Sequence, residues 1–241
     1  MKGTATAMQD QLNYIKPGRY KKPVDADSRR DEFDLKNGEV LYSGRPVDII
    51  FTGDSITHFM EANLYYGRFG LVLNRGIGGE VADILAWRFH ADVTQLHPRL
   101  CILMVGVNNI WELDNKISKK GAYDRRAANK VLALLEKSYR SMLEEAKENN
   151  FPLWMCSCLP TGEALPNLDL RNRFIVEINQ MIQGLVAEYG TKYVDYHSRL
   201  VKEDGITLQD GISREGCHPN YKGYTMMSEV LTPMLEEFFQ K

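Results

Sequence analysis

The chain has 241 residues, of which 44% are hydrophobic and 26% are charged, and its formal net charge at pH 7 is -2. This composition is typical of a globular enzyme with one large domain. It contains neither a basic stripe for nucleic acid nor an acidic solvating tail. The apolar runs are strand-sized and fall far short of the ~20 residues that a membrane helix needs. We therefore expect a small-molecule substrate, with no nucleic acid or membrane partner.

In chain order, the sequence predicts helices over about 27–42, 81–89, 127–148, 174–189 and 223–239, and strands over about 47–52, 71–73, 100–105, 153–159 and 192–196. The segment 100–105 is apolar at every position, as expected for a parallel strand buried on both faces. Residues 127–148 place their apolar side chains at helical spacing. Strands alternate with helices behind one additional leading helix. This pattern predicts an α/β domain over residues 26–241, with a five-stranded parallel sheet covered by helices on both faces.

The first 25 residues predict an irregular leader, because proline and glycine interrupt them. No apolar stretch follows Lys2, so the sequence as given predicts no secretory signal, although removal of such a segment is compatible with it. Cys156 and Cys158 lie two residues apart on a predicted strand and should face the same way, with neither redox nor zinc spacing. We interpret the four cysteines as buried reduced thiols, which favours a cytoplasmic location.

A serine directly follows the first predicted strand, in the turn Gly53-Asp54-Ser55. In an open α/β sheet, ligands bind at the carboxyl ends of the strands, so this turn lies where a reacting group is expected. Ser55 also begins a helical segment, whose free N–H groups favour developing negative charge. The structural alternative for Ser55 is a helix N-cap. We expect Asp54 to point away from it and to accept backbone N–H bonds in the turn.

One of the five histidines, His218, has a carboxylate three residues before it, at Glu215, and leads into the last predicted helix. A histidine oriented by a carboxylate can take the proton of a serine hydroxyl. We therefore assign Ser55 as nucleophile, His218 as base and Glu215 as orienting acid. Asp210, in the same loop, is the alternative acid, and the alternative role for His218 is structural.

Two further segments follow predicted strands, namely the glycine-rich turn that ends at Gly79 and the strand end that carries Asn108. With the Ser55 and His218 segments, they resemble the four motif blocks of the SGNH hydrolases, also called the GDSL esterase/lipase superfamily. Residues 75–79, 87–88 and 105–109 resemble its platelet-activating-factor acetylhydrolase type more closely. The resemblance covers roughly residues 45–235 and lies in four separated blocks in the expected order.

The resemblance implies a flavodoxin-like three-layer α/β/α sandwich and ester hydrolysis through an acyl-serine, without a metal or other cofactor. It also implies an oxyanion hole made by the backbone N–H groups of Ser55 and Gly79 and the side-chain amide of Asn108. The structural alternative for the glycines is a tight turn that needs positive φ. Glu215 departs from the family pattern, which usually has Asp there, but Glu serves this role in some other hydrolases.

The sequence predicts a serine esterase for short acyl groups, with acetyl as the favoured acyl group and carbohydrates as one candidate for the alcohol part of the ester. No lid or long apolar insertion for a fatty chain is visible. Candidate substrate-binding residues are His58, Phe59 and Trp111, and the structural alternative for them is packing at the rim of the site or at the surface. The alternatives are a thioesterase or lysophospholipase of the same superfamily, or a non-catalytic binding module on the same fold. The sequence leaves a homo-oligomer open.

Overall fold

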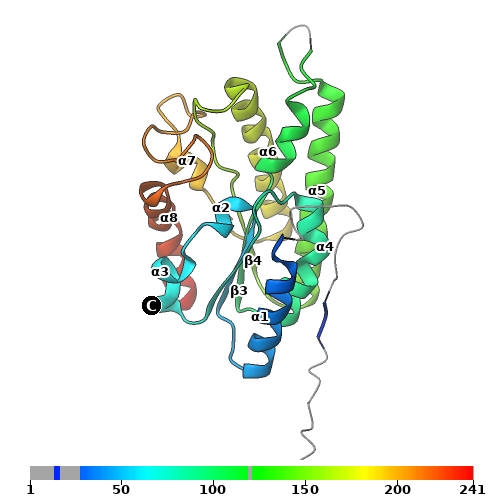
Figure 1. Ribbon diagram of the computed structural model, residues 1–241, viewed down its shortest axis with the longest axis vertical. Coiled ribbons are helices and arrows are strands. Elements are labelled where there is room, and N and C mark those ends of the chain that lie inside the picture. Colours follow the sequence, from blue (N-terminus) through cyan, green and yellow to red (C-terminus); the bar gives the residue numbers. More distant parts are fainter. Residues whose placement is uncertain (1–13, 17–27, 119–120, 241) are drawn as a thin grey trace, which may run out of the picture.

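The computed structural model describes residues 14–16, 28–118 and 121–240, and most of the predicted leader lies outside them (Figure 1). Its middle layer is an all-parallel sheet with strand order β2-β1-β3-β4-β5. The strands are β1 (Ile49–Gly53), β2 (Val72–Gly76), β3 (Leu100–Met104), β4 (Leu153–Cys156) and β5 (Tyr193–Val194). This order is the flavodoxin-like one. The predicted fold class, a flavodoxin-like α/β/α sandwich with five parallel strands, is confirmed.

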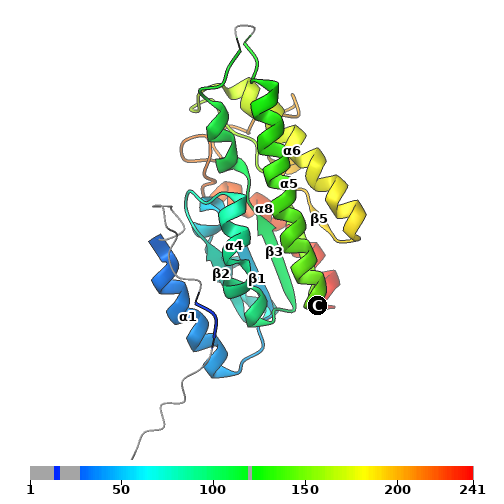
Figure 2. The same ribbon diagram turned by 90° about the vertical axis from the view of Figure 1, so that its right-hand side faces the viewer.

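Helices cover both faces of the sheet (Figures 1 and 2). One layer contains α1 (Arg30–Ser43), α4 (Ala82–Asp92), α5 (Arg125–Glu148) and α6 (Leu168–Tyr189), with α1 packed against α4. The other contains α2 (Ser55–His58), α3 (Ala62–Tyr66), α7 (Tyr196–Leu200) and α8 (Tyr221–Phe239). Three short 3-10 helices are η2 (Gly67–Phe69), η3 (Thr94–Leu96) and η4 (Val107–Leu113).

The central strand β3 explains why the sheet needs both layers. All five of its residues are buried. Cys101 and Leu103 join the apolar core under α4, α5 and α6, whereas Leu100, Ile102 and Met104 join the core under α8. Successive side chains of a strand point to opposite faces, so an uninterrupted apolar run stabilises the fold only when both faces are covered.

The strand predicted over residues 153–159 is shorter in the structure, where β4 ends at Cys156. Beyond it the alternation of strand side chains no longer applies. Cys156 lies in the core under α8, and Cys158 lies in the opposite core, where its Sγ donates to the Val105 carbonyl at 3.2 Å. The prediction that these two cysteines face the same way was wrong. All four cysteines lie in the described part of the chain, buried and outside any disulfide.

Helix α6 begins six residues before the predicted start, at Leu168 rather than residue 174. Its first turns are polar in sequence, yet Arg171 and Asn172 are fully buried. The Asn172 amide oxygen accepts the Thr161 N–H at 2.8 Å, and Arg171 pairs with Asp114 at 2.6 Å. Tertiary contacts therefore extend the helix through a segment whose own pattern is that of a loop. Within the described residues, no helix is long and apolar enough to cross a membrane.

Candidate active site

The turn after β1 places Ser55 at the carboxyl edge of the sheet. Gly53 closes β1, where a Cβ would lie 2.1 Å from the Met104 carbonyl oxygen, so a larger residue would separate the strands. The buried Asp54 carboxylate caps α2 by accepting the Ile56 N–H at 3.0 Å, as predicted. Burial, together with the charge of Glu80, raises the pKa of Asp54 to about 7. Ser55 is thus the first residue of a helix whose start is fixed by its neighbour.

His218 connects Ser55 to Glu215. The Nε2 atom of His218 lies 2.8 Å from the Ser55 Oγ, and its Nδ1 atom contacts the Glu215 carboxylate. The same carboxylate oxygen accepts the backbone N–H of His218 at 3.2 Å. Because this second bond fixes the loop between the two residues, the longer Glu side chain can fold back onto the ring from three positions earlier. The structure therefore places serine, histidine and carboxylate in one continuous relay.

Asp210, the alternative acid, lies elsewhere. Its side chain is 83% exposed and pairs with the Lys202 Nζ at 2.8 Å. A carboxylate held at the surface by a lysine does not orient the imidazole of His218. The geometry favours Glu215 as the partner of that ring.

The remaining site segments follow β2 and β3, the strands on either side of β1. Gly79 has φ of +78°, a conformation that an L side chain rarely adopts, so the turn requires glycine there. The Asn108 side-chain amide donates to the Glu80 carbonyl at 3.0 Å, and its Oδ1 accepts the Trp111 indole N–H at 3.2 Å. These bonds fix which way the amide faces, and an amide nitrogen carries a second hydrogen for a further acceptor.

A buried ionic network includes Glu80, the residue after Gly79, and no local sequence pattern predicts it. Arg88 donates to the Glu80 carboxylate at 2.8 Å and to Asp92 at 2.9 Å, and Arg30 of α1 donates to Asp92 at 2.6 Å. Burial opposes the charged form of Asp92, yet its bonds to Arg30 and the charge of Arg88 outweigh that effect and lower its pKa. Removing one partner of such a buried network typically costs about 3–5 kcal/mol. Loss of a member of this network should therefore destabilise the segment that follows Gly79.

The three candidate substrate-binding residues have different surroundings. Phe59 and Trp111 are 48% and 40% exposed, respectively. The Phe59 ring meets the His218 ring edge-on at 5.2 Å between centroids, and the Arg171 guanidinium lies 3.9 Å from the Trp111 ring centroid. His58 is half-buried, and its Nδ1 accepts the Gly78 N–H at 3.1 Å. Phe59 is therefore partly exposed beside His218 and Trp111 is partly exposed beside Asn108, whereas the His58 ring is bonded to the glycine turn.

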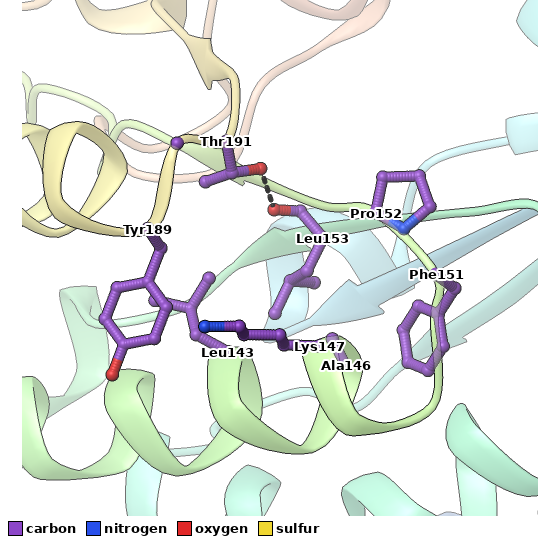
Figure 3. A pocket seen from close by; sticks show the side chains of 9 residues that line it. Leu143, Ala146, Lys147, Phe151, Pro152, Leu153, Tyr189 and Thr191 are labelled. Carbon is purple, nitrogen blue, oxygen red and sulfur yellow. Dashed lines mark hydrogen bonds between the residues drawn. The ribbon is translucent and has the colours of Figure 1, made fainter.

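A separate, mainly apolar cavity of about 240 Å³ contains none of the site residues in its lining (Figure 3). It is lined by the end of α5, including Leu143 and Lys147, and by Leu153 and Tyr189. Thr191 closes one side by donating to the Leu153 carbonyl at 2.7 Å. The lining therefore comes from the carboxyl ends of α5 and α6 and from the amino ends of β4 and β5. The cavity is therefore at the opposite edge of the sheet from Ser55.

Comparison with known proteins agrees with this arrangement. The model of the GDSL-like lipase/acylhydrolase family matches residues 51–226. The chain belongs to that family. The predicted membership of the SGNH, or GDSL, superfamily is thereby confirmed, and this GDSL-family chain carries Ser55, Gly79, Asn108 and His218 inside the matched region.

Individual relatives of this GDSL-family chain are distant. An acetylxylan esterase from Xylanibacter ruminicola is 22% identical over 158 residues, which are 63% of this chain and 31% of that protein. A structure described as a platelet activating factor, from Streptococcus pneumonia, has a TM-score of 0.67 at 22% identity, covering 87% of this chain and 94% of the other. A variant of an acetyl-xylooligosaccharide esterase from Geobacillus Stearmophilus has a TM-score of 0.61 at 18% identity, covering 80% and 95%. At these identities the structural likeness establishes the fold.

Proposed function

We propose that this chain is a serine esterase that removes short acyl groups, with acetyl esters of carbohydrates as its substrate class. The observation that carries the proposal is the relay in which His218 lies 2.8 Å from the Ser55 Oγ and contacts Glu215 through its other ring nitrogen. This arrangement can activate a hydroxyl at neutral pH. Family membership supports acylhydrolase activity, and the proposal specifies the bond that is cleaved.

In the proposed reaction, the Ser55 Oγ attacks the ester carbonyl carbon while the His218 Nε2 takes the hydroxyl proton. The resulting imidazolium is stabilised by Glu215, and it returns the proton to the departing alcohol oxygen as the carbon–oxygen bond breaks. Water then attacks the acyl-serine with His218 again as base. The second step releases the carboxylic acid and restores the serine.

We propose that three hydrogen-bond donors stabilise the oxyanion of both tetrahedral intermediates. They are the Ser55 and Gly79 N–H groups and the Asn108 side-chain amide. In the described part of the chain, neither backbone N–H has a hydrogen-bond partner. A Cβ at the adjacent Gly78 would lie 3.9 Å from the Ser55 Cβ, so a larger side chain there would occupy space beside the serine. Glycine leaves this space open for an acyl group. Donors fixed before the reaction stabilise the developing charge without reorganisation.

The carbohydrate part of the proposal is supported by Trp111 and Phe59. The contacts of Trp111 with Arg171 and Asn108 hold its ring in one orientation while part of the side chain stays exposed. A fixed, partly exposed aromatic ring beside Asn108 suits the apolar face of a sugar. Two of the compared proteins are named for acetylated xylan or its oligosaccharides.

Replacing Asn108 with alanine should lower kcat by about 10²–10³-fold with a smaller change in KM, because its amide would act mainly on the transition state. The measurement is steady-state hydrolysis of p-nitrophenyl acetate. Asn149→Ala, at the exposed end of α5, is the matched control and should leave both constants unchanged. If Asn108→Ala changes KM alone, Asn108 binds the ground-state substrate and does not act on the transition state.

The acyl preference is tested by kcat/KM for p-nitrophenyl acetate, butyrate, hexanoate and octanoate, with an acetylated xylo-oligosaccharide alongside. We expect a steep fall from acetate to hexanoate. The acyl space should be bounded by the Gly79 turn and the side chains near Asn108, and a closed pocket discriminates by ~1–3 kcal/mol per methylene. We also expect the acetylated oligosaccharide to be deacetylated.

Octanoate at or above acetate would overturn the acetylesterase assignment and indicate a lipase-like or thioesterase-like enzyme. Failure to hydrolyse any ester, together with no labelling by a fluorophosphonate, would indicate a binding module on the same fold.

A further inference from the structure

His58 contacts the turn that carries Gly79. It is the last residue of α2, three positions after Ser55, and its Nδ1 accepts the Gly78 N–H at 3.1 Å. The N–H that follows Gly78 in the chain is that of Gly79, the proposed oxyanion donor. The two N–H groups therefore belong to consecutive peptide units, and a bond that fixes the first restricts the direction of the second.

The turn packs closely on α2 at this point. A Cβ at Gly76 would lie 2.3 Å from the His58 backbone nitrogen, and one at Gly78 would lie 3.5 Å from the His58 Nδ1. Arg29 anchors the same turn by donating to the Gly76 carbonyl at 2.8 Å. His58 thus supplies one of several side-chain contacts that hold this stretch of backbone, since the Asn74 Oδ1 also accepts the Gly76 N–H at 2.9 Å.

The imidazole of His58 is itself held in place. It stacks on the Phe59 ring with centroids 5.1 Å apart and an interplanar angle of 29°. Phe59 in turn meets His218, so one row of rings connects the glycine turn with the proposed base. A ring fixed on this row can maintain a defined acceptor position for Gly78.

We propose that His58 is a positioning residue for the oxyanion hole, whose neutral ring accepts the Gly78 N–H and thereby directs the Gly79 N–H toward the oxygen above Ser55. This inference rests on the proposed function, because it assumes the oxyanion role of Gly79. It gives His58 a role different from the substrate contact expected from the sequence. His58 acts through the turn and touches no reacting atom.

The contact requires an unprotonated Nδ1, so the neutral ring carries its hydrogen on Nε2. The charged and titratable groups that face His58 are Arg29 at the start of α1, Glu32 in its first turn, and His218 across Phe59. Burial and then the charge of Arg29 lower the pKa of His58, against the opposing charge of Glu32. The neutral ring is therefore the form present at neutral pH. In acid, protonation converts the acceptor into a donor and breaks the bond to Gly78.

Two variants separate the acceptor from the bulk of the side chain. His58→Leu keeps similar volume without an acceptor, whereas His58→Asn offers an amide oxygen near the Nδ1 position and cannot gain a proton. With p-nitrophenyl acetate, we expect His58→Leu to lower kcat by about 10–100-fold with little change in KM, less than the loss of a donor itself. His58→Asn should recover most of that loss. His90→Asn, on the exposed face of α4, is the control and should match the wild type.

The pH dependence supplies a second readout. In acid, kcat/KM of the wild type should fall more steeply than that of His58→Asn, because protonation of His58 breaks the bond to Gly78 whereas the asparagine side chain cannot gain a proton. In the wild type, the amide proton resonance of Gly78 should titrate below the ordinary histidine value of 6.5, and this titration should be absent from His58→Asn.

Wild-type kcat in His58→Leu, or a Gly78 amide that does not respond to pH, would overturn the role of His58. Equal damage in His58→Leu and His58→Asn would also overturn it. If the wild type hydrolyses no ester, the proposed function fails by itself, and the NMR titration of Gly78 still decides whether His58 holds the turn.

Discussion

Replacing Ser55 with alanine should lower ester hydrolysis by about 10⁴-fold or more while the protein stays folded, because the variant lacks the atom that forms the acyl intermediate. The side chain of Ser55 contacts His218, whereas the turn is held by the Asp54 cap and the strand pairing of β1. The fold should therefore tolerate the change. The measurement is kcat/KM for p-nitrophenyl acetate, together with the melting temperature and labelling by a fluorophosphonate.

Ser43→Ala, at the exposed end of α1, is the control and should retain both activity and labelling. Activity near the wild-type level in folded Ser55→Ala protein would remove Ser55 from the mechanism. Labelling that persists in this variant would place the nucleophile at another side chain.

Replacing Glu215 with glutamine should lower kcat by up to about 10⁴-fold, because the amide keeps the shape of the side chain but can stabilise the wrong tautomer of His218. A neutral amide also fails to stabilise the imidazolium that forms during acyl transfer. Asp210→Asn is the matched control in the same loop, since that carboxylate pairs with Lys202 at the surface. We expect Asp210→Asn to stay within about twofold of the wild type, as surface ion pairs are worth little.

The measurement is kcat and KM at neutral pH for both variants. Their melting temperatures are compared with that of the wild type to show that both variants are folded. If Glu215→Gln leaves kcat almost unchanged while Asp210→Asn loses most of its activity, the assignment of the acid is reversed. Equal small losses in both variants would instead indicate that a backbone group orients His218.

Two arginines at the start of α1 contact the residues that support the site. Arg29 contacts the glycine turn, and Arg30 joins the buried network that also holds Glu80. Both residues lie before the region matched by the family model, which begins at residue 51. The leading helix is thus connected to the support of the site as well as to the outer layer of the fold.

The sequence alone predicted the fold class and the positions of the candidate site segments, because both depend on local patterns. The apolar run ending at Met104 and the helical spacing before Asn149 each reflect burial that repeats with the period of one element. Ser55, Gly79 and Asn108 were predicted to meet because parallel strands present their carboxyl ends at one edge. His218 was recognised from its spacing to Glu215, a contact within one short loop.

The tertiary structure alone decided contacts between segments that are distant in sequence. The fold pairs Asp210 with Lys202, and Glu215 contacts His218 instead. It also brings His58 of α2 to Gly78 in the turn after β2. It also buried charged side chains of α1 and α4 in one network. Local patterns do not encode such pairings, because a buried polar group is stabilised only by the partner that the whole fold brings to it.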